Sequence, residues 1–369
     1  MLSHLKFQIP LGRAGSPSRP RGRSARVLEV LLSAVPAILT LAASLAVTAP
    51  STFAAAAATP AASAPAPSAP STDTPTVIVV VGVQGEEDFG NVFAAQADAW
   101  NEIIRSVNAK GVLIGGPEAT TVTDRERLQA ALAGEPRQGR GELWIVMIGH
   151  GTFDGKEPKF NLRGPDVTGS DLADWLKPIA RPTVVVDTTS ASAPFMNKLA
   201  GAGRVIITAT RSGQEENYTR FGTHFVRALL SKDSDFDKDG QVSLLEAFLA
   251  GSASLAEFYK TEGRLASEHP LLDDNGDGLG TPPDWFRGVR AVKRAQNNAA
   301  PDGNRAMQLT LIPSPAERSL TPEVRAQRDA LELKLVALRD NKSRMDEDEY
   351  YRQLEQLLLQ IAALYPKPS

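Results

Sequence analysis

The chain has 369 residues, a formal net charge of −3 at pH 7 and no cysteine. A charge this close to neutral argues against a nucleic-acid ligand and against a strongly anionic membrane as partner. The lack of cysteine excludes disulfides, thiol catalysis, a lipoprotein anchor and metal sites built on thiolates. The length is sufficient for one sizeable core with a smaller appendage.

Residues 1–56 have the order of a secretory signal peptide. A basic stretch, Arg19–Arg26, precedes the apolar run Val27–Val47, and small alanines follow. This order predicts cleavage and export to a secreted or periplasmic location, with only transient membrane contact through the leader. An uncleaved anchor helix is the alternative, which Glu29 and Pro36 within the apolar run disfavour.

After the predicted signal peptide, the sequence predicts a flexible linker and then a folded domain. Residues 57–75 are almost wholly Ala, Pro, Ser and Thr, a composition typical of a flexible linker. Over residues 76–232, short β-branched runs alternate with helical stretches, which predicts an α/β three-layer sandwich with a mostly parallel sheet. The predicted strands are 76–83, 111–115, 142–149, 183–187 and 204–210, and the predicted helices are 92–107, 123–134 and 170–179.

Two of the predicted strands end in side chains suited to catalysis. His150 follows one strand and stands between two glycines, where its imidazole can act as a general base near neutral pH. The next strand ends at Asp187 and continues into a hydroxyl cluster that includes Thr189 and Ser190. Because the functional groups of such sheets gather at the carboxyl ends of the strands, we expect these side chains to lie close together.

This order of motifs resembles the caspase–haemoglobinase fold and, within it, the legumain and GPI-anchor transamidase family of cysteine peptidases. The resemblance covers about residues 76–230 and includes Gln96–Asp98, which match the family's Q-A-D signature. It implies a dyad with His150 as the base. Thr189 then occupies the position of the nucleophilic cysteine, or Ser190 does if the alignment is shifted by one residue.

Two departures from the family's pattern bear on activity. The cysteine is replaced by a hydroxyl residue, and Ala94 stands where the family has an arginine in its specificity pocket. A hydroxyl needs a well-oriented base to lose its proton, whereas a thiol is partly ionised near neutrality. The sequence therefore predicts a pseudo-peptidase that binds a peptide or protein ligand. An active hydrolase using Thr189 or Ser190 with His150 and Asp187 is the alternative, although no G-x-S-x-G motif exists. A structural scaffold is the third reading.

The segment 233–296 carries a motif of the calcium-binding type. The twelve residues DFDKDGQVSLLE fit the EF-hand loop at every position, as an insertion after the core. Hard cations require such a density of oxygen donors. The alternative is an acidic N-cap to the following helix. The expected Ca²⁺ ligands are Asp235, Asp237, Asp239, Glu246 and the backbone carbonyl of Gln241.

A second acidic run in this segment, DDNGDGLGTPPD at Asp273–Asp284, repeats the D-x-N-x-D-G order. It resembles the shortened calcium loops of secreted bacterial proteins, and its expected ligands are Asp273, Asn275 and Asp277. An ordinary turn rich in Asp, Asn and Gly is the alternative.

Residues 297–369 predict a C-terminal helical hairpin of the coiled-coil type. The first helix begins at Thr321, with Pro322 at its first helical position. Apolar residues then recur at spacings of three, four and seven, which predicts two antiparallel helices that pack on the core or self-associate. The two stripes are Val324, Leu331, Leu335 and Leu338, then Tyr350, Leu354, Leu357, Ile361 and Leu364.

Overall fold

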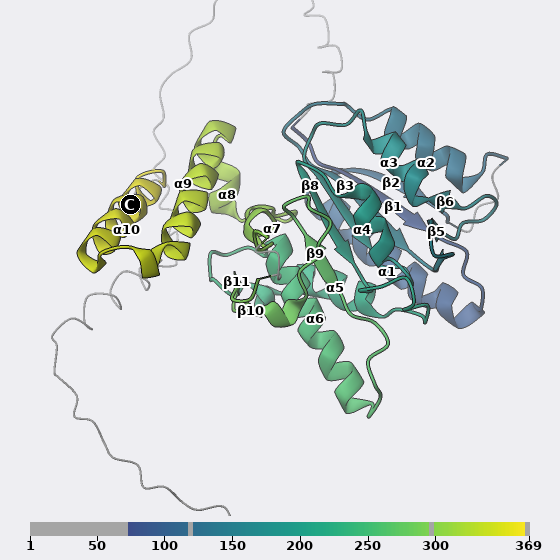
Figure 1. Cartoon of the computed structure of the whole chain (residues 1–369). Helices are drawn as coiled ribbons and strands as arrows, with labels where there is room; N and C mark the ends of the chain where they lie inside the picture. The colour runs from purple at the N-terminus through teal and green to yellow at the C-terminus, as the bar shows by residue number, and fades with distance from the viewer. Residues whose placement is uncertain (1–72, 117–120, 295–298, 366–369) are drawn as a thin grey trace, which may run out of the picture. The chain divides into compact units, whose positions relative to one another are not determined.

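The computed structural model describes residues 73–116, 121–294 and 299–365 (Figure 1). The predicted signal peptide, 1–56, and most of the predicted linker, 57–75, lie outside the described residues. Among the helices that are described, none is both long enough and apolar enough to cross a bilayer.

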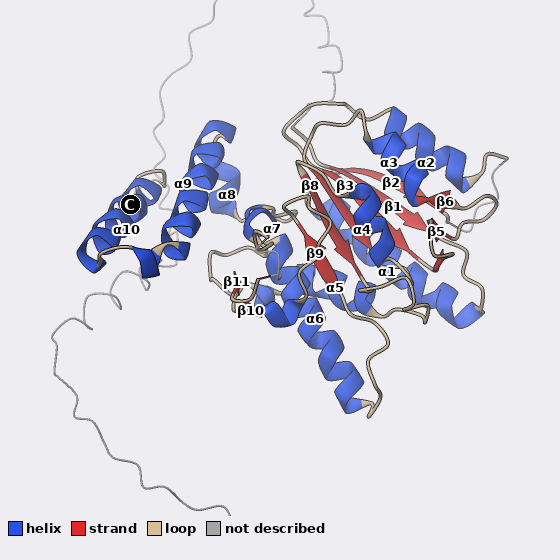
Figure 2. Cartoon of the chain, in the orientation of Figure 1, coloured by secondary structure: helices blue, strands red, loops and turns tan. Residues whose placement is uncertain are grey.

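A six-stranded sheet forms the centre of the domain (Figure 2). All the pairings between its first five strands are parallel, and only the last strand runs antiparallel to its neighbour. This arrangement confirms the α/β class with a mostly parallel sheet. In spatial order the strands are β2 (Lys110–Ile114), β1 (Thr76–Val81), β3 (Leu143–Ile148), β7 (Thr183–Asp187), β8 (Arg204–Thr208) and β9 (Leu271–Asp273).

Helices cover both faces of the sheet because its central strands, β1, β3, β7 and β8, are buried on both of their sides. Along β7, Val184 and Val186 join one core cluster, whereas Val185 between them joins the other. The first cluster is closed by α1 (Glu87–Ser106), α5 (Phe221–Leu230) and α6 (Leu244–Thr261), the second by α2 (Asp124–Ala133), α3 (Gly169–Leu176) and α4 (Ala193–Leu199).

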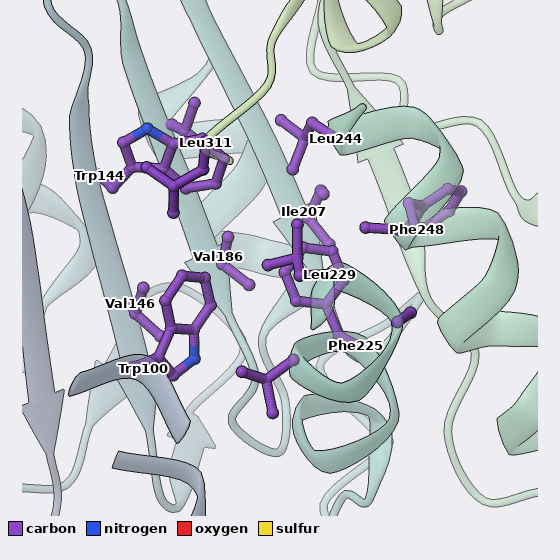
Figure 3. Packing of buried hydrophobic residues seen from close by; sticks show 14 of the residues in the cluster. Trp100, Trp144, Val146, Val186, Ile207, Phe225, Leu229, Leu244, Phe248 and Leu311 are labelled. Atoms are coloured by element: carbon purple, nitrogen blue, oxygen red, sulfur yellow. The ribbon is translucent and has the colours of Figure 1, made fainter. Parts of the chain in front are cut away.

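The first cluster contains the largest buried side chains of the domain. Trp100 of α1 stacks on Phe225 of α5, with their ring centroids 6.3 Å apart. Figure 3 shows Trp100 beside Val146 and Val186 of the central strands, and Phe225 on the side of Ile207. Leu311, from the chain that follows α7, also reaches this cluster, so a segment far along the sequence completes the core.

Several short elements have no counterpart among the predictions. Runs of two to five residues are too short to show a hydrophobic period, so only their tertiary contacts define them. They include β9, which lies in the segment 233–296. The others are β4 (Gly151–Phe153), β5 (Pro158–Phe160), β6 (Val167–Thr168), β10 (Phe286–Arg287), β11 (Arg290–Ala291), α7 (Asn304–Gln308), α8 (Pro315–Ser319), η1 (Lys232–Ser234), η2 (Pro283–Trp285) and η3 (Lys342–Arg344).

The C-terminal hairpin consists of α9 (Pro322–Asp340) and α10 (Glu347–Ala362), which pack against each other. The predicted stripe of α9 is buried at Leu331, Leu335 and Leu338, whereas on α10 only Tyr350 is buried. Arg328 is also buried on α9 and donates hydrogen bonds to Glu317 of α8 and to Asp329. The predicted coiled-coil character and self-association stay predictions.

Candidate functional site

The ends of β3 and β7 lie side by side, as their sequence pattern predicts. Met147 of β3 is in register with Asp187 of β7. One residue further, Thr188 donates from its backbone N and its Oγ1 to the carbonyl of Met147, at 3.0 and 2.7 Å. The turn that carries His150 and the turn that carries the hydroxyl cluster therefore emerge at the same edge of the sheet.

The two candidate nucleophiles are buried and hydrogen-bonded to other groups. Thr189 is 0 % exposed, and its Oγ1 lies 2.7 Å from Asp187 Oδ1, to which it donates. Ser190 is 2 % exposed, and its Oγ lies 3.1 Å from both the N and the O of Gly151. Ser190 Oγ accepts a hydrogen bond from the N of Gly151 and donates one to the O of Gly151. Each hydroxyl proton is thus directed at an acceptor other than His150.

Asp187 contacts the hydroxyl cluster and not the histidine. Its Oδ1 also accepts from the backbone N of Thr189 at 3.0 Å, and its Oδ2 has no hydrogen-bond partner among the described residues. Burial raises the pKa of Asp187 to about 7, against the two hydrogen bonds from Thr189, which lower it. A carboxyl that is about half protonated at neutral pH and hydrogen-bonded to Thr189 does not orient His150, contrary to the role expected in a hydrolase.

His150 is half-buried and surrounded by aromatic rings. Its Nε2 lies 3.3 Å from the carbonyl O of Gln84, and no hydrogen bond joins it to Thr189 or Ser190 in the described part of the chain. The ring centroids of Phe89, Phe93 and Tyr218 lie 5.2, 5.3 and 6.4 Å from that of the imidazole.

The three rings around His150 were not identified from the sequence. Phe89 and Phe93 stand four residues apart on α1, so they share a helix face. That spacing was the available signal. Tyr218 comes from the loop after β8 and stacks on Phe89 with centroids 4.6 Å apart, a contact that only the fold creates.

The rest of the hydroxyl cluster ties the strand ends together. Ser192 Oγ accepts from the backbone N of Ala209 and of Thr210, both at 3.1 Å. Ala191 has φ +52°, in the left-handed region, and its N donates to the carbonyl of Glu215 at 2.8 Å. All these residues except Glu215 are buried. The cluster therefore fixes the turn after β7 and leaves no hydroxyl of this turn open to solvent.

The first acidic loop, Asp235–Glu246, brings its carboxylates together at one point. Ligand oxygens of Asp235, Asp237 and Asp239 lie within 4.8 Å of one another. Positive φ angles at Lys238, +64°, and at Gly240, +90°, turn the loop back on itself. Burial, followed by the charges of the neighbouring acids, raises the pKa of Asp237 to about 6. The cluster therefore carries uncompensated repulsion between like charges.

Glu246, the last residue of the first loop, is hydrogen-bonded to residues near the loop's start and end. It is 1 % exposed, and its Oε1 accepts from the backbone N of Phe236 and Asp237 at 2.7 and 3.2 Å. Its Oε2 accepts from the N and Oγ of Ser243, both at 2.8 Å, as part of the capping box that begins α6. If the loop is numbered from Asp235 as position 1, Glu246 at position 12 accepts hydrogen bonds from residues at positions 2, 3 and 9.

The second acidic loop, Asp273–Asp284, has the same hydrogen bonds between its own residues as the first loop, when both are numbered from their first aspartate. The position-6 amide donates to the position-1 carboxylate in both loops, over 3.1 Å at Asp235 and 2.8 Å at Asp273. The position-5 amide donates to the position-3 side chain, over 3.2 and 2.9 Å, and the position-7 amide to the position-5 carboxylate, over 3.0 and 2.8 Å. The glycines at positions 4 and 6, Gly276 and Gly278, have φ +81° and +72°.

Asp302 occupies in the second loop the place that Glu246 has in the first. Its Oδ1 accepts from the N of Asp274 and Asn275, positions 2 and 3, at 3.0 and 3.3 Å. Its Oδ2 accepts from Oγ1 of Thr281, position 9, at 2.6 Å. The position-12 residue Asp284 is instead exposed and paired with a lysine.

Asp302 was not identified from the sequence, because it lies outside the twelve-residue window and no local motif marks it. It is 3 % exposed, and burial raises its pKa to about 8. A buried carboxyl with so high a pKa is stabilised by a proton or by a cation.

Two cavities adjoin the acidic loops. One, of about 500 Å³, is lined by residues of the second loop with Met196, Leu271 and Trp285. The other, of about 430 Å³, lies between the first loop, α7 and α9. Neither is lined by His150, Thr189 or Ser190.

Comparison with known proteins gives distant structural likeness only. No protein-family model matches the sequence, and no curated protein matches it. The initiator caspase Dronc of Drosophila is similar with 12 % identity and a TM-score of 0.35, over 56 % of this chain and 81 % of that one. Caspase-1 of Spodoptera frugiperda is similar with 10 % identity and a TM-score of 0.34, over 57 % and 91 %. A Geobacter sulfurreducens protein is similar with 11 % identity and a TM-score of 0.36, over 57 % and 98 %.

Proposed function

We propose that the chain is an exported, calcium-binding, caspase-like pseudo-peptidase of the legumain type that binds a peptide or protein ligand without cleaving it. The observation that carries the proposal is that the hydroxyls of both candidate nucleophiles donate hydrogen bonds to groups other than His150. Thr189 donates to Asp187 and Ser190 to Gly151, and both side chains are buried. Export is inferred from the composition of residues 1–56 alone.

The chemistry of nucleophilic attack explains why these hydrogen bonds oppose catalysis. A serine or threonine attacks a carbonyl only as its proton passes to a base within hydrogen-bond reach. Here the base candidate, His150, contacts Gln84, and the hydroxyl protons have other acceptors. A substrate carbonyl must also approach the oxygen, which burial of both hydroxyls prevents.

The exposed part of the same edge supports a binding role. Half-exposed rings of Phe89 and Tyr218 stack beside His150, and the guanidinium of Arg220 lies 5.1 Å from the centre of the Tyr218 ring. Aromatic faces with a cation and an imidazole beside them suit an extended peptide, since they offer apolar area and polar groups together. The ligand then lies over His150, above the buried hydroxyls.

Calcium binding is the second part of the proposal. Residues in the first loop fit a hard cation, because three carboxylates converge and Asp235 Oδ1 is buried without a partner among the described residues. In the second loop Asp273, Asn275 and Asp277 take the same positions, and Asp302 supplies the closing carboxylate. Bound Ca²⁺ supplies the positive charge that relieves the repulsion within each cluster.

A peptide library with fluorogenic ends tests the pseudo-peptidase directly. We expect no turnover by the wild type, and binding of some peptides, measured by fluorescence anisotropy, that weakens in Phe89→Ala and Tyr218→Ala. His224→Ala is the matched control, because that imidazole bonds Ser254 on α6. Turnover that disappears in His150→Ala but persists in His224→Ala would overturn the proposal and establish the active hydrolase.

The scaffold reading makes a different prediction. Leu358 and Leu359 of α10 are 44 % and 64 % exposed, so the hairpin presents an apolar surface. Absence of both turnover and peptide binding, together with an oligomer in size-exclusion chromatography that Leu359→Glu dissociates, favours a protein that assembles through its hairpin.

A further inference from the structure

One segment contacts both acidic loops. Residues 302–314, which we call the strap, begin with Asp302, which is hydrogen-bonded to the second loop. The strap then reaches the first loop, where the carbonyl of Leu309 accepts from the N of Leu244 at 2.8 Å. At its end, Ser314 N donates to the side-chain oxygen of Gln241, position 7 of the first loop, at 3.1 Å.

The second loop determines where the strap becomes helical. Asp274 Oδ2 accepts from the backbone N of Arg305 and Ala306 at 2.7 and 2.8 Å, two amides in the first turn of α7 that have no partner within the helix. The N-cap residue Gly303 has no side chain to cap this short helix. The start of α7 therefore depends on a residue of the second loop that lies beside the proposed ligands.

The first loop contacts the middle of the strap through both polar and apolar groups. Ser243 Oγ lies 3.5 Å from Met307 Sδ. Ala306, Leu309 and Leu311 are buried in the same core cluster as Leu244. The backbone freedom of the strap therefore depends on its contacts with both loops.

We propose that the strap couples the two loops, so that Ca²⁺ binding to either loop orders the strap and raises the affinity of the other loop. This inference rests on the proposed calcium function. An ion in the second loop holds Asp302, the first residue of the strap, and an ion in the first loop holds the backbone beside Gln241 and Leu244. The entropy cost of ordering the strap is then paid by the first ion alone, which gives positive cooperativity.

Coupling of this kind is reciprocal, and that property makes it testable. Calorimetric titration of the full chain with Ca²⁺ is expected to give two sites in the wild type. Asp302→Asn loses the second-loop site and weakens the first by about tenfold, within the usual range for coupled sites. Glu246→Gln loses the first-loop site and weakens the second by the same factor. Glu102→Gln, on the exposed surface of α1, is the matched control and leaves both sites unchanged.

Hydrogen exchange of the strap amides gives a second measurement, and it also shows whether each variant is folded. We expect Ca²⁺ to protect the amides of Arg305 and Ala306 in the wild type, and to protect them less in Glu246→Gln, although that substitution lies in the other loop. Two sites that keep their wild-type affinities when the other is removed would overturn the coupling and leave calcium binding intact. A wild type that binds no Ca²⁺ would overturn the proposed function and the coupling with it.

Discussion

The side chain of Thr189 donates to the carboxyl group of Asp187, two residues earlier, with 2.7 Å between Oγ1 and Oδ1. Both side chains are fully buried. The hydrogen bond satisfies one oxygen of the acid and the only proton of the hydroxyl. The two residues that a hydrolase would use as nucleophile and orienting acid therefore bind each other, and they hold the turn after β7 in place.

The raised pKa of Asp187 predicts how stability depends on pH at this site. In the unfolded chain this carboxyl loses its proton near pH 3.8, and in the folded chain near pH 7. The folded state thus binds more protons between these values, so the contribution of Asp187 is fully present below pH 4 and is lost as pH rises to 7. Over this interval the free energy of unfolding falls by an amount on the order of 4 kcal/mol.

Asp187→Asn removes this ionisation while keeping an oxygen for Thr189. Urea denaturation of both proteins from pH 4 to pH 8 measures the effect. We expect the stability of the wild type relative to the variant to fall with pH over this interval. A difference that stays constant with pH contradicts the assignment, because all other titrating groups are common to both proteins.

Single cysteines test the burial of the candidate nucleophiles, since the chain has no other thiol. Thr189→Cys and Ser190→Cys are expected to react with iodoacetamide about a hundredfold more slowly than the exposed control Thr152→Cys, because reaction waits for local opening. Neither variant is expected to hydrolyse peptides. Rapid labelling at position 189 or 190, or thiol-dependent cleavage, contradicts the closed turn.

Calcium is expected to raise the thermal stability of the protein. At a free concentration of 100 times Kd, one bound ion adds about 2.7 kcal/mol to the free energy of unfolding. Differential scanning calorimetry in Ca²⁺ and in chelator measures the shift in Tm. In Glu246→Gln the shift is expected to shrink, whereas in Glu102→Gln it stays as in the wild type. A wild-type Tm that is equal in both solutions counts against either loop as a site.

Arg328 is expected to fix the start of the hairpin to α8. Its side chain is buried with Glu317, so Arg328→Met leaves that acid buried with only the partly exposed Arg325, 3.7 Å away, as an ionic partner. Breaking a buried pair in this way costs about 3–5 kcal/mol. Hydrogen exchange of α8 and α9 reports the loss of local stability. Arg352→Met is the control, because that arginine pairs with Glu349 on the exposed side of α10 and its removal is expected to have little effect.

Much of the framework follows from local pattern. The parallel strands are recognisable because each is a short run rich in β-branched or apolar residues, and α1 to α3 because their apolar residues recur three or four positions apart. The acidic loop around Asp235 is recognisable because all its donors fall within twelve residues. Asp302 and Tyr218 cannot be recognised in this way, because each lies in a segment that is distant in sequence from its site and has no motif around it.

What the sequence by itself determined is therefore the class of the sheet and the edge at which His150, Asp187 and the hydroxyls meet. The alternation of short β-branched runs with helical stretches, and the residues that directly follow each run, are local properties of the sequence, and they are sufficient for that. Only the tertiary structure decided which groups the hydroxyls bond. Thr189 Oγ1 lies 2.7 Å from Asp187 Oδ1 and 3.2 Å from the carbonyl O of Ser190, and Ser190 Oγ lies 3.1 Å from the carbonyl O of Gly151. Because both hydroxyls are buried, each must find its acceptor within the protein. That acceptor is Asp187 for Thr189 and Gly151 for Ser190.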